Sequence, residues 1–126
     1  MSLQTPLARA KGAGAAKEGV QHWWHQRLTA LALVPLTLWL AFSAALMSTA
    51  DYATVVHWLG HPLNGGLMML ALAVGFYHGT LGVQEVILDY VASEWKKTTL
   101  LLVVQFAAVV LALGAILSVL LIMLEG

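Results

Sequence analysis

Three long apolar runs constrain the fold of this chain more than any other feature. They cover residues 28–46, 63–88 and 98–124, and their only acidic, basic or histidine residues are His78 and Glu85, both in the second run. A helix crosses the roughly 30 Å hydrocarbon core of a bilayer in about 20 residues, and lipid offers no hydrogen-bond partner to non-helical backbone. The sequence therefore predicts an all-α membrane protein with three transmembrane helices, at about 26–48, 63–89 and 97–124.

The composition supports this prediction and excludes several kinds of site. The chain is 60% hydrophobic and 10% charged, whereas a soluble domain has about 45–50% apolar and about 25% charged residues. It has no cysteine, which excludes disulfides, zinc–thiolate sites and Cys-ligated iron–sulfur clusters within the chain. We find no flavin motif and no soluble domain, so we do not expect the chain to be an enzyme by itself. Pro35 should bend the first span.

The basic residues predict the orientation. All six lie before the first run or between the second and third runs, on what the positive-inside rule makes the cytoplasmic side: Arg9, Lys11, Lys17, Arg27, Lys96 and Lys97. The N-terminus is then cytoplasmic and the C-terminus periplasmic. We expect residues 1–21 to form a mobile cytoplasmic tail and residues 22–126 to form the three-helix anchor domain.

One face of the second span is polar and lined by small residues. At 100° per residue, Gly75, Gly82, Glu85 and Asp89 all fall within about 60° of His78. Small residues let a neighbouring helix or a flat cofactor approach the backbone closely. Gly75 and Gly82 are therefore predicted to line a cofactor groove.

His78 itself has two interpretations, which the pattern leaves open. A histidine deep in lipid is a functional-site hypothesis, because such groups are expensive there. It either binds a haem iron or hydrogen-bonds a neighbouring helix. No second histidine lies equally deep, since His22 and His25 precede the first span and His57 and His61 are expected in a solvated outer loop. A bis-histidine haem would therefore take its other ligand from another chain.

Four residues near the cytoplasmic edge are further candidates. Asp89 and Tyr90 end the second span and either bind and protonate a quinone or form an ordinary helix end. Arg27 and His25 open the first span and can serve a haem propionate or the quinone site, although Arg27 at a helix end also commonly snorkels to lipid phosphate. We expect Glu85 to be protonated, or paired with Arg27 or with a partner chain.

Two motifs and the three-span layout carry a resemblance to a known family. The segment GVQHWWHQRLTA (residues 19–30) leads into the first span, and His78-Gly79 is followed by Asp89-Tyr90 at the end of the second. Together they resemble the hydrophobic membrane anchor subunits of succinate dehydrogenase (complex II), the smaller cytochrome b-type subunits, of α-proteobacterial and mitochondrial type. The resemblance covers nearly the whole chain.

The resemblance implies a function, cofactors and partners. It implies a second anchor subunit, one b-type haem held between the two by a histidine from each, and an iron–sulfur subunit and a flavoprotein (carrying the clusters and FAD) on the cytoplasmic side of the bacterial inner membrane. Electrons from succinate would pass to ubiquinone. By this resemblance His78 is the axial haem ligand, Tyr90 a quinone-binding residue with Asp89 as its neighbour, and Arg27 a basic residue near the haem propionates.

Two other functions compete with this one. The chain is alternatively a haem-free structural anchor of a membrane complex, with His78 hydrogen-bonded to a neighbouring helix. Or it is a small proton-conducting subunit that uses His78, Glu85 and Asp89 as a relay, although nothing ionisable continues outward from His78 in that span.

Overall fold

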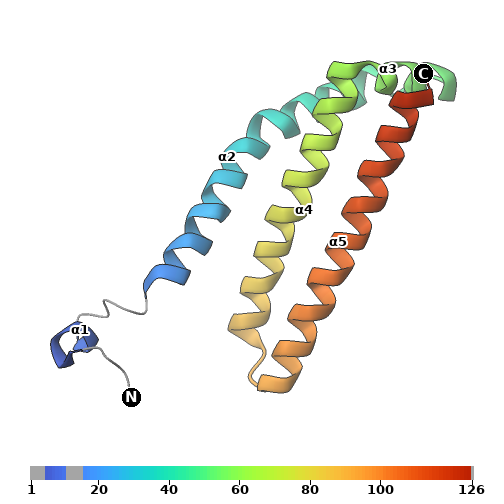
Figure 1. Cartoon of the computed structure of the whole chain (residues 1–126). Coiled ribbons are helices and arrows are strands. Elements are labelled where there is room, and N and C mark those ends of the chain that lie inside the picture. The colour runs from blue at the N-terminus through green and yellow to red at the C-terminus, as the bar shows by residue number, and fades with distance from the viewer. Residues whose placement is uncertain (1–4, 11–15, 126) are drawn as a thin grey trace.

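The chain folds into helices alone over the residues that the computed structural model describes, 5–10 and 16–125. The helices are α1 (Pro6–Ala10), α2 (Ala16–Leu46), α3 (Tyr52–Gly60), α4 (Pro62–Tyr90) and α5 (Glu94–Glu125) (Figure 1). Three segments are long and apolar enough to cross a membrane: Gly19–Leu46, Pro62–Tyr90 and Glu94–Glu125. The predicted all-α fold with three spans is thus confirmed, while the orientation of the termini stays a prediction.

The first long helix starts earlier than the sequence predicted. α2 begins at Ala16, ten residues before the predicted start of the first span, and continues through Pro35 to Leu46. Its course curves in Figure 1, in keeping with the helical hydrogen bond that a proline removes. Within the tail expected at residues 1–21, residues 6–10 and 16–21 are helical. Residues 1–4 and 11–15 lie outside the described residues, and the mobility of the tail stays a prediction.

The connection between α2 and α4 contains a helix where the sequence analysis expected a loop. Asp51 caps α3, and its side chain accepts a hydrogen bond of 2.9 Å from the Thr54 backbone N–H. The prediction that His57 lies in a loop was wrong, because it lies on α3. His61 joins α3 to α4, where its Nδ1 accepts from the Leu63 N–H at 3.2 Å and Pro62 occupies the first turn.

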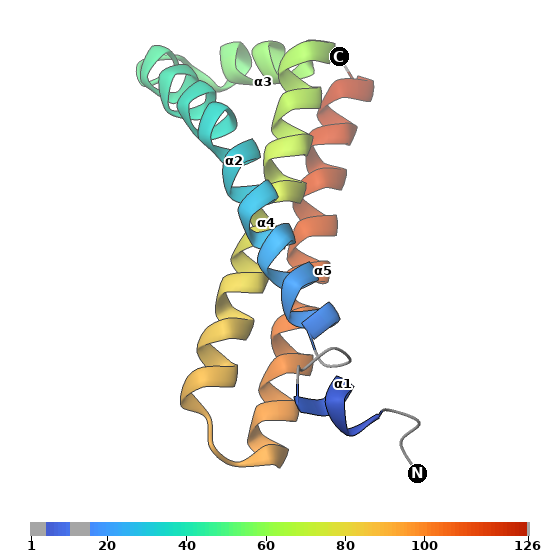
Figure 2. The ribbon, with the colours of Figure 1, turned by 90° about the vertical axis from the view of Figure 1, so that its left-hand side faces the viewer.

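α4 is the central helix of the molecule. α2 packs against it on one side and α5 on the other, and α3 packs on α4 and α5 at the end of the molecule where α4 begins and α5 ends (Figures 1 and 2). Among the described residues, α2 and α5 make no close backbone contact with each other. α4 and α5 run side by side in both views, whereas α2 crosses α4 obliquely in Figure 2. The spans therefore form a row with two separate contact zones, α2–α4 and α4–α5.

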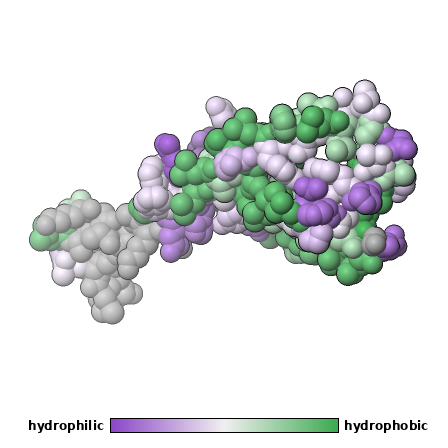
Figure 3. Space-filling view, turned by 90° about the horizontal axis from the view of Figure 1, so that it is seen from above, coloured by the Kyte–Doolittle hydropathy of each residue, from purple (hydrophilic) through white to green (hydrophobic). Residues whose placement is uncertain are grey.

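The exterior is apolar, as a bilayer or a partner subunit requires. Among the described residues only four hydrophobic side chains are buried, Leu36, Leu81, Ile87 and Val119, while most of the large apolar side chains face outward. Seen from the end that carries α3, green apolar patches lie over several parts of the visible face, between paler and purple ones (Figure 3). A row of three helices has too little interior to form a hydrophobic core, so its stability in isolation depends on lipid or on further subunits.

Candidate functional site

Polar side chains meet across the contact between α2 and α4. We call this contact zone the polar seam and define it by eight residues: His22, His25, Gln26 and Thr29 of α2, and Tyr77, His78, Gly82 and Glu85 of α4. The residues of each helix recur at spacings of three, four or one, which is how a helix brings side chains to one side. The seam thus collects both the histidine and the glutamate of the second apolar run.

His78 lies at one end of this seam, opposite the end formed by His22 and Glu85, and is half-buried. Its Nδ1 is 2.9 Å from the Thr29 hydroxyl oxygen. The same hydroxyl donates to two carbonyl oxygens of its own helix, those of His25 at 2.7 Å and Gln26 at 3.1 Å. The imidazole is therefore held at one nitrogen by α2, and its other nitrogen, Nε2, makes no hydrogen bond within the described residues.

A groove beside His78 runs along α2. It has a volume of about 400 Å³ and is lined by Ala30, Leu33, Val34, Thr37, Leu38 and His78. Gly75 and Gly82, which the sequence analysis placed in one groove with His78, do not line it. A Cβ added to Gly82 would stand 3.7 Å from the Gln26 amide nitrogen, so Gly82 provides close approach between α2 and α4.

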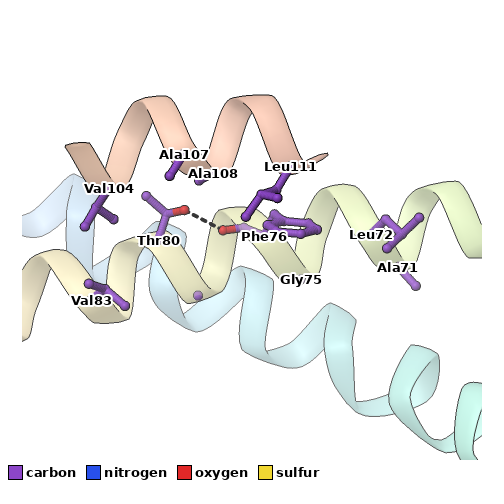
Figure 4. Close-up of a pocket in the computed structure, with 11 residues that line it drawn as sticks. Ala71, Leu72, Gly75, Phe76, Thr80, Val83, Val104, Ala107, Ala108 and Leu111 are labelled. Carbon is purple, nitrogen blue, oxygen red and sulfur yellow. Dashed lines mark hydrogen bonds between the residues drawn. The ribbon is translucent and has the colours of Figure 1, made fainter. Parts of the chain in front are cut away.

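Gly75 lies instead at the contact between α4 and α5. It lines a separate hollow of about 510 Å³ with Leu72, Phe76 and Thr80 of α4 and Val104, Ala108 and Leu111 of α5, among others (Figure 4). The Thr80 hydroxyl in this hollow donates to the Phe76 carbonyl of its own helix at 2.7 Å. We call this α4–α5 contact the apolar seam, because its lining offers no free polar group among the described residues.

Glu85 has a partner that the sequence did not predict. Its Oε1 lies 2.9 Å from His22 Nδ1 across the polar seam. Of the three alternatives given for Glu85, the pairing with Arg27 is wrong, since the Arg27 guanidinium lies over the Trp23 ring, 5.2 Å from its centroid. His22 Nε2 and the Gln26 side-chain oxygen are buried and have no hydrogen-bond partner among the described residues.

His25 is also engaged within the chain. Its Nδ1 is 2.9 Å from the Tyr77 hydroxyl, and the two rings are tilted, with centroids 6.0 Å apart. Sequence reasoning missed Tyr77, although it precedes His78 directly. On a helical wheel it falls 100° away from His78, outside the polar arc, so the period of α4 did not predict its contact with His25 of α2.

The predicted quinone-binding residues lie at the end of α4, away from the seam contacts. Asp89 is exposed, and the Tyr90 side chain is 82% exposed at the last residue of the helix. Neither makes a hydrogen bond or ion pair to another described side chain. Their polar groups are therefore free for a ligand or another subunit.

The donor set fits one kind of metal site and excludes another. The described residues contain no group of three or more His, Cys, Asp or Glu side chains that could hold a bare metal ion. A haem iron has four ligands from its porphyrin and needs only axial ligands from protein, for which one imidazole suffices on one side. His78, with its free Nε2 beside a groove, fits that requirement.

These features define a three-span helical membrane protein with a histidine held in a polar interhelical seam. The sequence profile of the succinate dehydrogenase/fumarate reductase transmembrane subunits matches residues 1–113 of this chain. The chain belongs to this family, among the hydrophobic membrane anchor subunits of succinate dehydrogenase.

Individual relatives agree over most of their lengths. The chain is 32% identical over 117 residues to the succinate dehydrogenase hydrophobic membrane anchor subunit of Rickettsia bellii, covering 93% of this chain and 94% of the relative. The subunit so named in Paracoccus denitrificans is 30% identical over 112 residues, 89% of this chain and 87% of the relative. The succinate dehydrogenase membrane anchor subunit of Reclinomonas americana is 27% identical over 96 residues, 74% and 80% of the two chains. No solved structure matches significantly.

Proposed function

We propose that this anchor subunit shares a b-type haem with a second anchor subunit and helps to form the site where electrons from succinate reduce ubiquinone. The observation that carries the proposal is the position of His78, with Nδ1 held by Thr29 and Nε2 unengaged beside an apolar groove. When bound, the haem supplies a one-electron redox centre.

The rest of the haem site must come from outside this chain. Among the described residues, no other histidine lines the groove beside His78. The second axial ligand is then a residue of the partner anchor subunit. Arg27 lies on α2, two residues before Thr29, and carries a permanent positive charge, which suits it to a haem propionate. His25 is held by Tyr77 and contributes to the wall of the site through the seam.

The quinone site is assigned to the exposed end of α4. The Tyr90 hydroxyl is a donor for a quinone carbonyl, and the Asp89 carboxylate beside it can exchange protons with water. At 1.5 Å per residue, the twelve residues from His78 to Tyr90 span about 18 Å along the helix axis. Haem and quinone would thus occupy different depths of the same helix, in a complex seated in the bacterial inner membrane.

The remaining partners are proposed from the family to which the chain belongs. The chain has no cysteine, so it cannot itself hold iron–sulfur clusters. We propose that an iron–sulfur subunit and an FAD-carrying flavoprotein dock on the cytoplasmic side, next to Tyr90. The exposed Trp23, Trp24 and Trp95 side chains at that end of the spans suit an interface or the bilayer boundary.

One observation favours the haem-free structural anchor as a second candidate. The Thr29 hydroxyl already gives His78 a hydrogen-bond partner across the helices, as that function requires. A haem-free structural anchor would leave His78 Nε2 and the adjoining groove without a role, so this function explains less of the site. The relay function is not supported in the same way, because Glu85 pairs with His22 on α2.

A reduced-minus-oxidised spectrum of the complex, co-expressed with its partner subunits, tests the proposal. His78→Ala should abolish or alter the haem spectrum, whereas Tyr90→Phe should keep the haem and slow quinone reduction about tenfold, the loss of one hydrogen bond of about 1.4 kcal/mol. His57→Ala, an exposed histidine on α3, is the matched control and should change neither. Unchanged haem ligation in His78→Ala, or a complex purified without haem, would overturn the proposal.

A further inference from the structure

We propose that Thr29 is a positioning residue for His78, which fixes the tautomer and the orientation of the imidazole so that Nε2 is presented to the haem iron. This inference rests on the proposed haem ligation and adds to it a second residue, from a different helix. It comes from the hydrogen bonds around a single hydroxyl group.

The proton of the Thr29 hydroxyl can be located by elimination. The hydroxyl oxygen lies 2.7 Å from the carbonyl oxygen of His25 and 3.1 Å from that of Gln26. A carbonyl oxygen has no proton to give, so the one hydroxyl proton must point toward these carbonyls. Two bare oxygens would repel each other at 2.7 Å. The hydroxyl is therefore a donor within α2.

The His78 tautomer follows from that assignment. With its proton directed into α2, the Thr29 oxygen has only lone pairs left for His78 Nδ1, which is 2.9 Å away. Nδ1 must then carry a proton and donate it to this oxygen. A neutral imidazole with a proton on Nδ1 has a bare lone pair on Nε2, the form that binds a metal. The other tautomer would place a proton where the iron must bind.

The same bond should tune the iron. A histidine ligand that donates its second N–H to an acceptor is held in orientation and becomes a stronger electron donor to the metal. A stronger donor favours ferric over ferrous iron and lowers the reduction potential of the haem. Thr29 is well placed for this role, because both residues are part-buried in the seam and its hydroxyl is anchored to its own helix.

The chain contains a matched control for this threonine. Thr80 lies on α4, two residues from His78, and its hydroxyl donates to the carbonyl four residues before it, that of Phe76, at 2.7 Å. Like Thr29, it donates a hydrogen bond to a carbonyl of its own helix. Unlike Thr29, it lies in the apolar seam and has no side-chain partner on another helix among the described residues. A change at Thr80 therefore reproduces the loss of a hydroxyl without touching His78.

The test is a redox titration and an electron paramagnetic resonance spectrum of the haem in the co-expressed complex. Thr29→Val is nearly isosteric and lacks the hydroxyl. It should shift the ferric-to-ferrous equilibrium about tenfold toward ferrous haem, which is about 59 mV upward for one electron, and should change the ferric spectrum. Thr29→Ala should shift the potential in the same direction. Thr29→Ser should restore the wild-type values, and Thr80→Val should leave them unchanged.

The outcomes separate this proposal from the one on which it rests. Wild-type potential and spectrum in both Thr29→Val and Thr29→Ala overturn the role of Thr29, as does an equal shift in Thr80→Val. His78→Ala is measured in the same series. If it loses the haem while Thr29→Val behaves as wild type, the haem proposal stands and the Thr29 proposal falls. If the haem keeps its ligation in His78→Ala, the proposed function itself falls.

Discussion

The two contact zones of α4 differ in what holds the helices together. Across the polar seam, three side-chain pairs join α2 to α4: His22 with Glu85, His25 with Tyr77, and Thr29 with His78. Across the apolar seam, the described residues form no such pair. Hydroxyl groups on α4 and α5, such as those of Thr80, Thr99 and Ser118, donate to carbonyls of their own helices instead.

This difference bears on the proposed function of the polar seam. Polar contacts between membrane helices are worth only about 0.6 kcal/mol on average, so they are an inefficient way to join helices. Apolar helices associate well through the fit of their side chains, and the apolar seam shows that this chain can join helices in that way. The polar groups of the other seam are then best explained by the chemistry they serve, since ionisable groups are costly in lipid.

If fit alone stabilises the apolar seam, adding one methyl group there should cost the most. A Cβ on Gly65 would clash with the Met123 side chain of α5 and would stand 2.7 Å from the Leu59 carbonyl oxygen. Gly65→Ala should therefore destabilise the complex by about 1–3 kcal/mol, as overpacking does. The neighbouring Gly66 has nothing within 4 Å of its Cβ position, so Gly66→Ala should be neutral or slightly stabilising.

Thermal unfolding of the purified complex in detergent measures this pair of variants. Equal melting temperatures for Gly65→Ala and Gly66→Ala would show that the fit at this end of the apolar seam does not limit stability. The statement that side-chain fit holds α4 and α5 together across the apolar seam would then be wrong.

The sequence predicted the spans well because they depend on composition alone. Residues 28–46, 63–88 and 98–124 are long and apolar, and no tertiary information is needed to identify them. The sequence did not predict α3, whose start depends on the single Asp51 cap. It also did not predict that α2 begins at Ala16, where a polar stretch of helix precedes the membrane span. Such boundaries depend on local hydrogen bonds that hydropathy does not report.

The site was harder to predict than the spans. The period of a helix identified the face of α4 with His78 and Glu85, but it carries no information on which face of α2 lies opposite. The partners Thr29 and His22, and the separation of Gly75 from the His78 groove, depend on the crossing of α2 over α4. Helix crossing follows from side-chain packing between elements far apart in the sequence.

The pair of His22 and Glu85 tests the polar seam itself. A double-mutant cycle with His22→Ala and Glu85→Ala should give a coupling free energy of about 0.6 kcal/mol and at most about 1.7 kcal/mol. The pair of Glu94 and Lys97, 3.4 Å apart within the first turn of α5, is the control, and its coupling should be near zero because Glu94 is exposed to solvent. Both are measured by unfolding of the complex. A coupling free energy for His22 and Glu85 no larger than that of the control would show that this pair does not stabilise the contact between α2 and α4.

The smallest expected effect lies at α3, which packs on α4 and α5 at one end of the apolar seam. Hydrogen bonds from the Thr54 side chain and backbone hold the pKa of Asp51 below its usual value. Because the folded state prefers the carboxylate, the contribution of this cap to α3 is present above the unfolded pKa of about 4 and is lost as the pH falls through the lower folded value.

Hydrogen exchange in the first turn of α3 measures this loss. The protection factor of the Thr54 amide should fall between pH 6 and pH 3 in the wild-type complex, because the protonated carboxyl is a weaker acceptor. In Asp51→Asn the cap is neutral at every pH, and asparagine caps helices about as well as aspartate, so protection should not change with pH. A fall of equal size in Asp51→Asn would place the acid-sensitive group elsewhere. The contact of α3 with the end of the apolar seam would then depend on packing alone, as the rest of that seam does.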